Sequence, residues 1–131
     1  MSVRLSCTDW VEGGWGIEDS VALSRLLREA GADLIDCSSG GLAPQARIPI
    51  GPGYQAAFAE RVKREADIPT AAVGLITEAD QAGSIVSQGK ADLILMAREF
   101  LRDPYWPLRH AMTEDGRRIP SPPAQYGRAF S

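Results

Sequence analysis

The feature that most constrains the fold of this sequence is the regular alternation of short apolar runs with helical stretches. The apolar runs predict four strands, at Val3–Ser6, Leu34–Cys37, Thr70–Val73 and Leu93–Met96. Three of the four are nearly continuous in apolar or small residues, which is typical of parallel strands covered on both faces. The helical stretches predict helices at Glu18–Ala30, Tyr54–Ala66, Thr77–Gly89 and Tyr105–Met112.

Local signals support the expected helix boundaries. Gly31 follows the first apolar stripe as a C-terminal cap. Thr77, with Asp80 three residues on, has the pattern of an N-cap, and Pro104 follows Asp103 as at a helix start. The resulting order, strand then helix four times over, predicts a parallel α/β sheet with right-handed crossovers. An internal similarity supports this order. Residues 31–35 read Gly-Ala-Asp-Leu-Ile, and residues 89–94 read Gly-Lys-Ala-Asp-Leu-Ile.

Composition excludes several classes of protein. The net charge is −3 and the basic residues form no cluster beyond Arg117-Arg118, so we expect no nucleic-acid partner. No apolar run approaches the roughly 20 residues that cross a membrane, and the N-terminus has no secretory pattern, so we expect a cytoplasmic protein. Cys7 and Cys37 lack metal-ligand spacing, which predicts no metal site. His110 is expected to be a solvated helix residue.

Ligands of parallel βα folds gather at the carboxyl ends of the strands. Arg4 lies in the first strand, where a guanidinium is costly unless it meets an anion or several acceptors; the alternative is exposure at a fraying terminus. The segment Ser38–Gly41 allows close backbone approach to a ligand but also suits an ordinary loop. The loop runs on to Gly53, which is long for a βα connection and makes it a candidate substrate-side loop.

A phosphate site is expected after the last two strands. Gly74 follows the third strand, and Ala97 and Arg98 follow the fourth. In parallel (β/α)8 barrels, the loops after the last two strands often bind a phosphate group through backbone N–H groups and the start of a short helix. An arginine there adds a charge-assisted donor. The tail at 117–131 is expected to be an extended arm that ends in Gln125–Arg128; its composition alone would suit a frayed terminus.

Five segments of the sequence together resemble a known family. In chain order they are Val-Arg-Leu-Ser, Asp-Leu-Ile-Asp-Cys-Ser-Ser-Gly-Gly, Pro-Gly-Tyr-Gln, Ala-Val-Gly-Leu-Ile-Thr and Ala-Asp-Leu-Ile-Leu-Met-Ala-Arg-Glu-Phe-Leu-Arg-Asp-Pro. In this order they resemble the C-terminal half of the old yellow enzyme family of NAD(P)H:flavin oxidoreductases, especially the bacterial thermophilic-like ene-reductases. The resemblance implies an α/β fold: residues 1–131 as strands five to eight of a (β/α)8 TIM barrel, with FMN at its carboxyl mouth.

The resemblance also implies roles for five residues. Arg4 would lie near the flavin pyrimidine ring, while Gly74, Ala97 and Arg98 would bind the FMN phosphate. The family often has glycine where Ala97 stands, and a methyl group there leaves the backbone N–H in place. Arg128 resembles the C-terminal arginine that this subclass inserts into the active site of a neighbouring subunit, which favours a functional arm over a frayed terminus.

A complete barrel needs about 250 residues, so the chain of 131 residues is expected to lack the family's substrate-orienting residues and to hold no catalytic residue of its own. The resemblance implies hydride transfer from NAD(P)H through FMN to an activated alkene, such as an α,β-unsaturated carbonyl compound. The alternative is a non-catalytic half-barrel that binds phosphate or FMN weakly or serves in assembly. We expect a homo-oligomer, or association with a complementary N-terminal half, because a half-barrel exposes two sheet edges.

Overall fold

The structure is a computed structural model that describes residues 1–110 and 123–129. The chain divides into two compact units, Met1–Met96 and Ala97–Ser131, and each is described by itself. Among the residues that are described, no helix is both long and apolar enough to cross a membrane.

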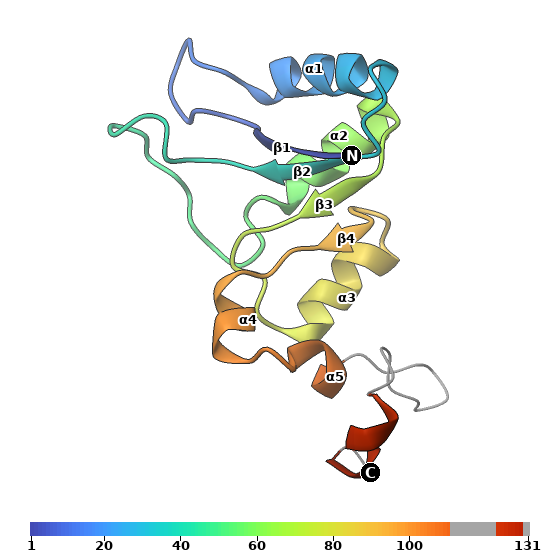
Figure 1. The fold of residues 1–131 in the computed structure, drawn as a ribbon. Coiled ribbons are helices and arrows are strands. Elements are labelled where there is room, and N and C mark those ends of the chain that lie inside the picture. Colours follow the sequence, from blue (N-terminus) through green and yellow to red (C-terminus); the bar gives the residue numbers. More distant parts are fainter. Residues whose placement is uncertain (111–122, 130–131) are drawn as a thin grey trace. The chain divides into compact units, whose positions relative to one another are not determined.

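The first unit is built on a parallel sheet in which each strand pairs with the next along the chain, in the order β1-β2-β3-β4 (Figure 1). The strands are β1 (Ser2–Ser6), β2 (Leu34–Ser38), β3 (Thr70–Ala72) and β4 (Leu93–Ile94). This confirms the predicted parallel α/β sheet. The last two strands are shorter than predicted, because the chain turns away after Ala72 and Ile94. The Leu95 N–H still donates to the Ala72 carbonyl at 2.9 Å.

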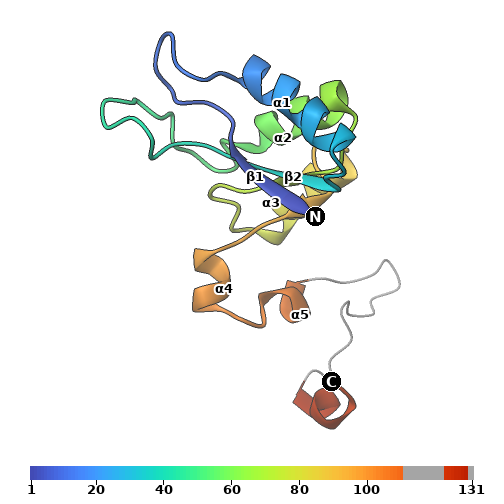
Figure 2. The same cartoon turned by 45° about the horizontal axis from the view of Figure 1, so that its top comes forward.

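Three helices connect these strands: α1 (Ile17–Glu29), α2 (Ala56–Ala66) and α3 (Ala79–Ser87). Figures 1 and 2 both show α1 and α2 side by side over the same part of the sheet. The core lies between helices and sheet, where Ile35 and Cys37 of β2 meet Val62 of α2, all fully buried. Because side chains alternate along a strand, the residues between them point to the opposite face. No helix of residues 1–96 covers that face, and Leu93 on it is 52% exposed.

Local chemistry accounts for the helix boundaries. The Asp19 carboxylate accepts a hydrogen bond from the Gly16 N–H at 2.9 Å and so begins α1. After the helix, Gly31 has φ +93°, a left-handed conformation that glycine adopts without cost. The prediction that Thr77 caps α3 was wrong. Glu78 is the N-cap of α3, and the Thr77 N–H donates to the side chain of Gln81 at 3.2 Å.

The two copies of the Ala-Asp-Leu-Ile segment enter the sheet in the same way. The Asp92 N–H donates to the Thr70 carbonyl at 2.8 Å, and the Asp92 carboxylate accepts from the Thr70 N–H at 2.9 Å. Asp33 repeats both contacts with Met1, the residue before β1. Its N–H donates to the Met1 carbonyl, and its carboxylate binds the Met1 amino group. Each aspartate therefore fixes the register of two neighbouring strands at their amino ends.

The second unit contains three short helical segments: α4 (Arg98–Arg102), α5 (Trp106–His110) and the 3₁₀ helix η1 (Ala124–Ala129). Helix α4 was not expected from the sequence. The helix expected at Tyr105–Met112 is present as α5, although Met112 lies outside the described residues. Of the arm expected at 117–131, only 123–129 are described. His110 is exposed at the end of α5, with its ring stacked on Trp106 at a centroid distance of 4.5 Å.

Candidate functional site

Arg4 lies on the uncovered face of the sheet, in register with Asp36 on the next strand. Its Nη1 atom lies 3.2 Å from a carboxylate oxygen of Asp36, and its Nη2 donates to the Ser38 hydroxyl at 2.9 Å. The side chain remains 60% exposed. Arg4 is therefore part of a regular strand and not a fraying terminus. Its acceptors direct the guanidinium toward Ser38, the last residue of β2, at the carboxyl end of the sheet.

Asp36 is a partner that sequence reasoning missed. Only 12% of its side chain is exposed, and its Oδ1 atom is buried with no hydrogen-bond partner among the described residues. Burial raises the pKa of Asp36, and the attraction of the Arg4 guanidinium only partly opposes this. The sequence signal was available, because an aspartate inside an apolar strand needs a partner and Arg4 is the basic residue of the neighbouring strand.

Gly74 begins a strained turn directly after β3. Its φ is +114°, and Leu75 after it also has a positive φ of +50°, which is rare for a leucine. The Gly53 N–H donates to the carbonyls of both residues, at 2.9 Å to Gly74 and 3.3 Å to Leu75. A Cβ atom at position 74 would lie 2.7 Å from Nε2 of Gln55. Position 74 therefore requires glycine for its backbone conformation and for space.

Gln55 joins the loops that follow β2 and β3. Only 3% of the residue is exposed. Its Oε1 atom accepts from the Ser39 hydroxyl at 2.7 Å, and its Nε2 donates to the Val73 carbonyl at 3.0 Å. Sequence reasoning missed this role, although Gln55 closes the Pro-Gly-Tyr-Gln segment that it had singled out. Ser39 belongs to the loop expected to approach a ligand, and in the structure its hydroxyl binds Gln55.

Ala97 and Arg98 belong to the second unit. Ala97 is the N-cap of α4, and its carbonyl accepts from the Leu101 N–H at 3.2 Å. Arg98, the first residue of α4, is exposed and has no ion pair within the described part of the chain. Arg102, one turn further on, binds Glu99 instead. Arg128 is exposed in η1. Arg98 thus begins α4 with its side chain exposed.

The loop between β1 and α1 is held by hydrogen bonds and aromatic packing. The Asp9 carboxylate accepts from the Trp15 N–H at 2.9 Å, and the Trp15 indole N–H donates to Ser20 at 2.6 Å. Trp10 has a positive φ of +59° and packs edge-on against Phe58 at a centroid distance of 5.6 Å. Trp10 and Trp15 therefore hold this loop against helices α2 and α1.

The two cysteines belong to the hydrophobic core. Both are free and fully buried. The hydrogen bond with Cys7, together with burial, raises the pKa of Cys37, so that its thiol stays protonated. No group of three or more metal-ligating side chains occurs among residues 1–110 and 123–129.

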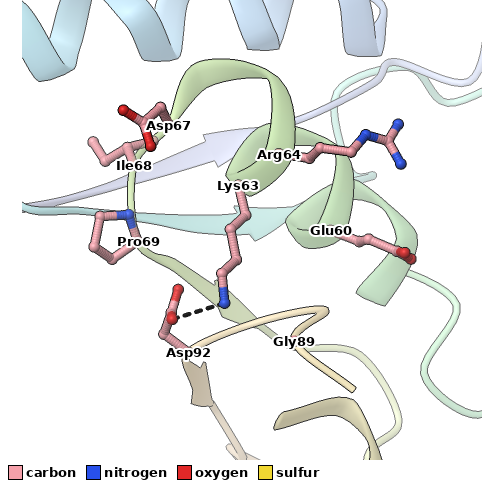
Figure 3. A pocket seen from close by; sticks show the side chains of 8 residues that line it. All are labelled: Glu60, Lys63, Arg64, Asp67, Ile68, Pro69, Gly89 and Asp92. Atoms are coloured by element: carbon pink, nitrogen blue, oxygen red, sulfur yellow. Dashed lines mark hydrogen bonds and ion pairs between the residues drawn. The ribbon is translucent and has the colours of Figure 1, made fainter. Parts of the chain in front are cut away.

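A pocket of about 520 Å³ lies at the opposite, amino end of the sheet (Figure 3). Its lining residues are Glu60, Lys63, Arg64, Asp67, Ile68, Pro69, Gly89 and Asp92. The Lys63 ammonium and the Asp92 carboxylate face each other across it at 2.8 Å, and the same carboxylate binds the Thr70 N–H. The Lys63–Asp92 ion pair is thus part of the lining of this pocket, and the residues expected to bind a ligand lie elsewhere.

The fold defines a parallel βα protein in which each strand pairs with the next along the chain. The chain belongs to the NADH:flavin oxidoreductase / NADH oxidase family, whose model matches residues 1–115. It is 50% identical over 128 residues to an NADPH dehydrogenase of Halalkalibacterium halodurans and 44% identical to one of Bacillus subtilis. Each alignment covers 98% of this chain and 37% of the relative, so the chain spans little more than a third of their length.

A solved structure shares the fold. It is a 2-naphthoyl-CoA reductase in complex with 2-naphthoyl-CoA, which superposes with a TM-score of 0.69 at 28% sequence identity. The match covers 79% of this chain and 16% of the reductase chain. The βα arrangement described above is thus found within a larger reductase. The relatives support FMN and NADPH as the cofactors of this family.

Proposed function

We propose that this chain forms the flavin-phosphate-binding part of an FMN-dependent NADPH oxidoreductase of the ene-reductase type. The observation that carries the proposal is the turn at Gly74, where conformation and space both demand glycine. Its carbonyls are engaged by Gly53, whereas the N–H groups of Gly74 and Leu75 donate no hydrogen bond among the described residues. Free N–H groups after a strand of a βα fold suit a phosphate group.

Within the second unit, the Ala97 N–H and the Arg98 guanidinium would bind a phosphate group, since Arg98 begins α4 and is exposed. Arg4 would stand beside the flavin ring, held by Asp36 and Ser38. Bound FMN would accept hydride from NADPH and deliver it to an activated alkene such as an α,β-unsaturated carbonyl compound. The positive charge of Arg4 would favour the negatively charged reduced flavin.

We further propose that the sheet forms strands five to eight of a closed (β/α)8 barrel. Two features support this: the parallel order β1-β2-β3-β4 leaves β1 and β4 as open edges, and the face carrying Arg4 and Leu93 has no helix over it within residues 1–96. Closure would need a complementary N-terminal half or a second copy of the chain. Arg128 would then reach the substrate site of a neighbouring subunit, and the assembly would act in the cytoplasm.

Flavin titration of the purified chain tests the proposal. We expect FMN to bind, and Arg98→Ala to weaken binding by about 10- to 150-fold, because losing a charge-assisted hydrogen bond costs about 1.5–3 kcal/mol. Arg102→Ala is the matched control from the same helix, since Arg102 binds Glu99, and it should leave the dissociation constant unchanged. Equal effects of the two substitutions would contradict the phosphate assignment.

Activity and assembly are measured on the same material. Oxidation of NADPH by the FMN-loaded chain in the presence of 2-cyclohexenone would support the complete reaction. A chain that retains FMN but does not oxidise NADPH would instead support the non-catalytic half-barrel. Light scattering at micromolar concentration should show an oligomer, and a folded monomer that melts cooperatively would contradict the half-barrel.

A further inference from the structure

We propose that Gln55 is a positioning residue that gives this site its preference for a phosphorylated flavin, by holding the N–H groups of Gly74 and Leu75 open to the phosphate. This inference rests on the proposed function, because it concerns the same FMN site. It assigns a specific task to a buried side chain that touches no ligand itself.

The contacts of Gln55 explain why its side chain can act at a distance. It is the residue directly before α2, and both ends of its amide group are bonded to loops at the carboxyl ends of the strands. The Ser39 hydroxyl donates to it from the loop after β2, and it donates to the Val73 carbonyl at the end of β3. A side chain that is 3% exposed and bonded at both ends has a single orientation.

The position of the amide fixes the turn beside it. Nε2 of Gln55 occupies the space that a Cβ of residue 74 would need, and it binds the carbonyl of Val73 immediately before the turn. Gly53, two residues earlier in the chain, binds the carbonyls of Gly74 and Leu75. Segment 53–55 therefore engages three successive carbonyls, of residues 73, 74 and 75. With those carbonyls held on one side, the N–H groups of Gly74 and Leu75 remain available to an anion.

An amide is the side-chain chemistry that this position requires. Ser39 supplies a donor and the Val73 carbonyl an acceptor, so only a group that accepts at one end and donates at the other satisfies both. Methionine has a similar length and fills the same space, but its thioether cannot donate and accepts only weakly. Gln55→Met should therefore release the Val73 carbonyl and let the turn relax, while leaving the packing beneath α2 largely intact.

The first test compares FMN with riboflavin, which has the same ring and no phosphate. We expect Gln55→Met to raise the FMN dissociation constant about tenfold and to change that of riboflavin less than twofold, since only the phosphate contacts are lost. Gln88→Met, at an exposed glutamine after α3, is the matched control and should change neither constant. Equal losses for the two flavins would overturn the inference and leave Gln55 a structural residue.

The second test needs no flavin. In ¹⁵N-labelled chain titrated with inorganic phosphate, the amide signals of Gly74 and Leu75 should shift in the wild type and in Gln88→Met but not in Gln55→Met. A wild-type chain without this response would overturn the inference. If the phosphate response is present but neither flavin binds, the proposed FMN function fails while the role of Gln55 stands.

A third variant covers the case in which Gln55→Met does not fold. Gln55→Glu keeps the size of the side chain, and its protonated carboxyl group can still donate to the Val73 carbonyl. Its FMN affinity, divided by that of the wild type at each pH, should therefore fall as the pH rises and the carboxyl ionises. A ratio that stays flat at unity from pH 5 to 8 while the variant is folded would contradict the positioning role.

Discussion

The two ends of the sheet are built by different means. At the amino ends, the connections are short, and Asp33 and Asp92 bind the neighbouring strand through both backbone and side chain. Positive φ angles occur there as well, but at Gly31, Asp67 and Gly89, which simply end helices. At the carboxyl ends, the loops 7–16, 39–55 and 73–78 are longer and include a tryptophan and a leucine with positive φ.

This difference shows where the chain gains stability and where it gives some up. At the amino ends the Lys63–Asp92 ion pair of Figure 3 is formed, and among the described residues the buried side-chain atom left without a partner there is the Thr70 hydroxyl. Toward the carboxyl ends, polar atoms of Ser6, Asp9, Trp10 and Asp36 are buried without partners in the described part of the chain. A concentration of unpaired groups and backbone strain at one end is expected where a ligand binds. Substitutions at the amino ends should therefore affect stability alone.

The largest expected effect is that of Gly74→Ala. The new Cβ meets Nε2 of Gln55 at 2.7 Å and the positive φ becomes unfavourable, so the free energy of unfolding should fall by about 2–4 kcal/mol. Urea unfolding measures the change, at fixed protein concentration because association affects stability. Gly89→Ala, which has a positive φ but open space around it, is the control and should cost less. Equal costs would show that the contact with Gln55 is unimportant.

The next effect is that of Asp92→Ala at the amino end. It leaves the Thr70 N–H without its carboxylate acceptor and removes the half-exposed ion pair with Lys63, which should lower the free energy of unfolding by about 1–3 kcal/mol. FMN and phosphate binding should not change. Glu60 lines the same pocket, and Glu60→Ala, the control, should have little effect on stability or on ligand binding. A loss of phosphate binding in Asp92→Ala would break the division between the two ends.

A smaller and opposite effect is expected from Gly83→Ala. Gly83 is an exposed residue within α3, and the space that a Cβ would occupy there is open, so alanine should fit freely. Replacing a glycine within a helix by alanine should raise the free energy of unfolding by about 0.5–1 kcal/mol. Thermal melting followed by circular dichroism checks the sign. Comparing Gly83→Ala with Gly74→Ala distinguishes the general stability cost of a glycine from the structural need for glycine at position 74.

The smallest expected effects, each below about 1 kcal/mol, concern pH and have opposite signs. Burial raises the pKa of Asp36 above its ordinary value of 3.8, so its contribution to stability is present below that pH and is lost as the pH rises through the raised value. Burial also opposes the charge of Asp92, but the Lys63 ammonium and the Thr70 N–H outweigh it and lower the pKa. The stability from Asp92 is therefore present above pH 3.8 and is lost as the pH falls.

Urea unfolding from pH 3 to 7 distinguishes these contributions. As the pH rises, the stability of the wild type relative to Asp36→Asn should decrease, whereas its stability relative to Asp92→Asn should increase. Parallel curves for the two variants would mean that the two aspartates experience the same environment, contrary to the comparison.

The sequence predicted the order of elements and the parallel sheet, because apolar runs and helical periodicity are local signals. It did not predict α4, since Arg98–Arg102 is too short for periodicity to show. It also missed Asp36 and Gln55, whose roles depend on contacts between segments that only the fold brings together. Gly74 could be singled out because glycine after a strand is a local signal, whereas its neighbour in space could not.

The simple strand order has a consequence for how this chain folds. Every strand pairs with the next one along the chain, so each pairing requires closure of a single βα unit and no distant segment has to be recruited first. Pairing strands that follow each other in the chain costs less loop-closure entropy than pairing more distant strands would. The sheet can therefore grow strand by strand from either side. A segment with this strand order keeps its own strand pairings when it is duplicated, exchanged or encoded separately. This makes it a natural unit of recombination.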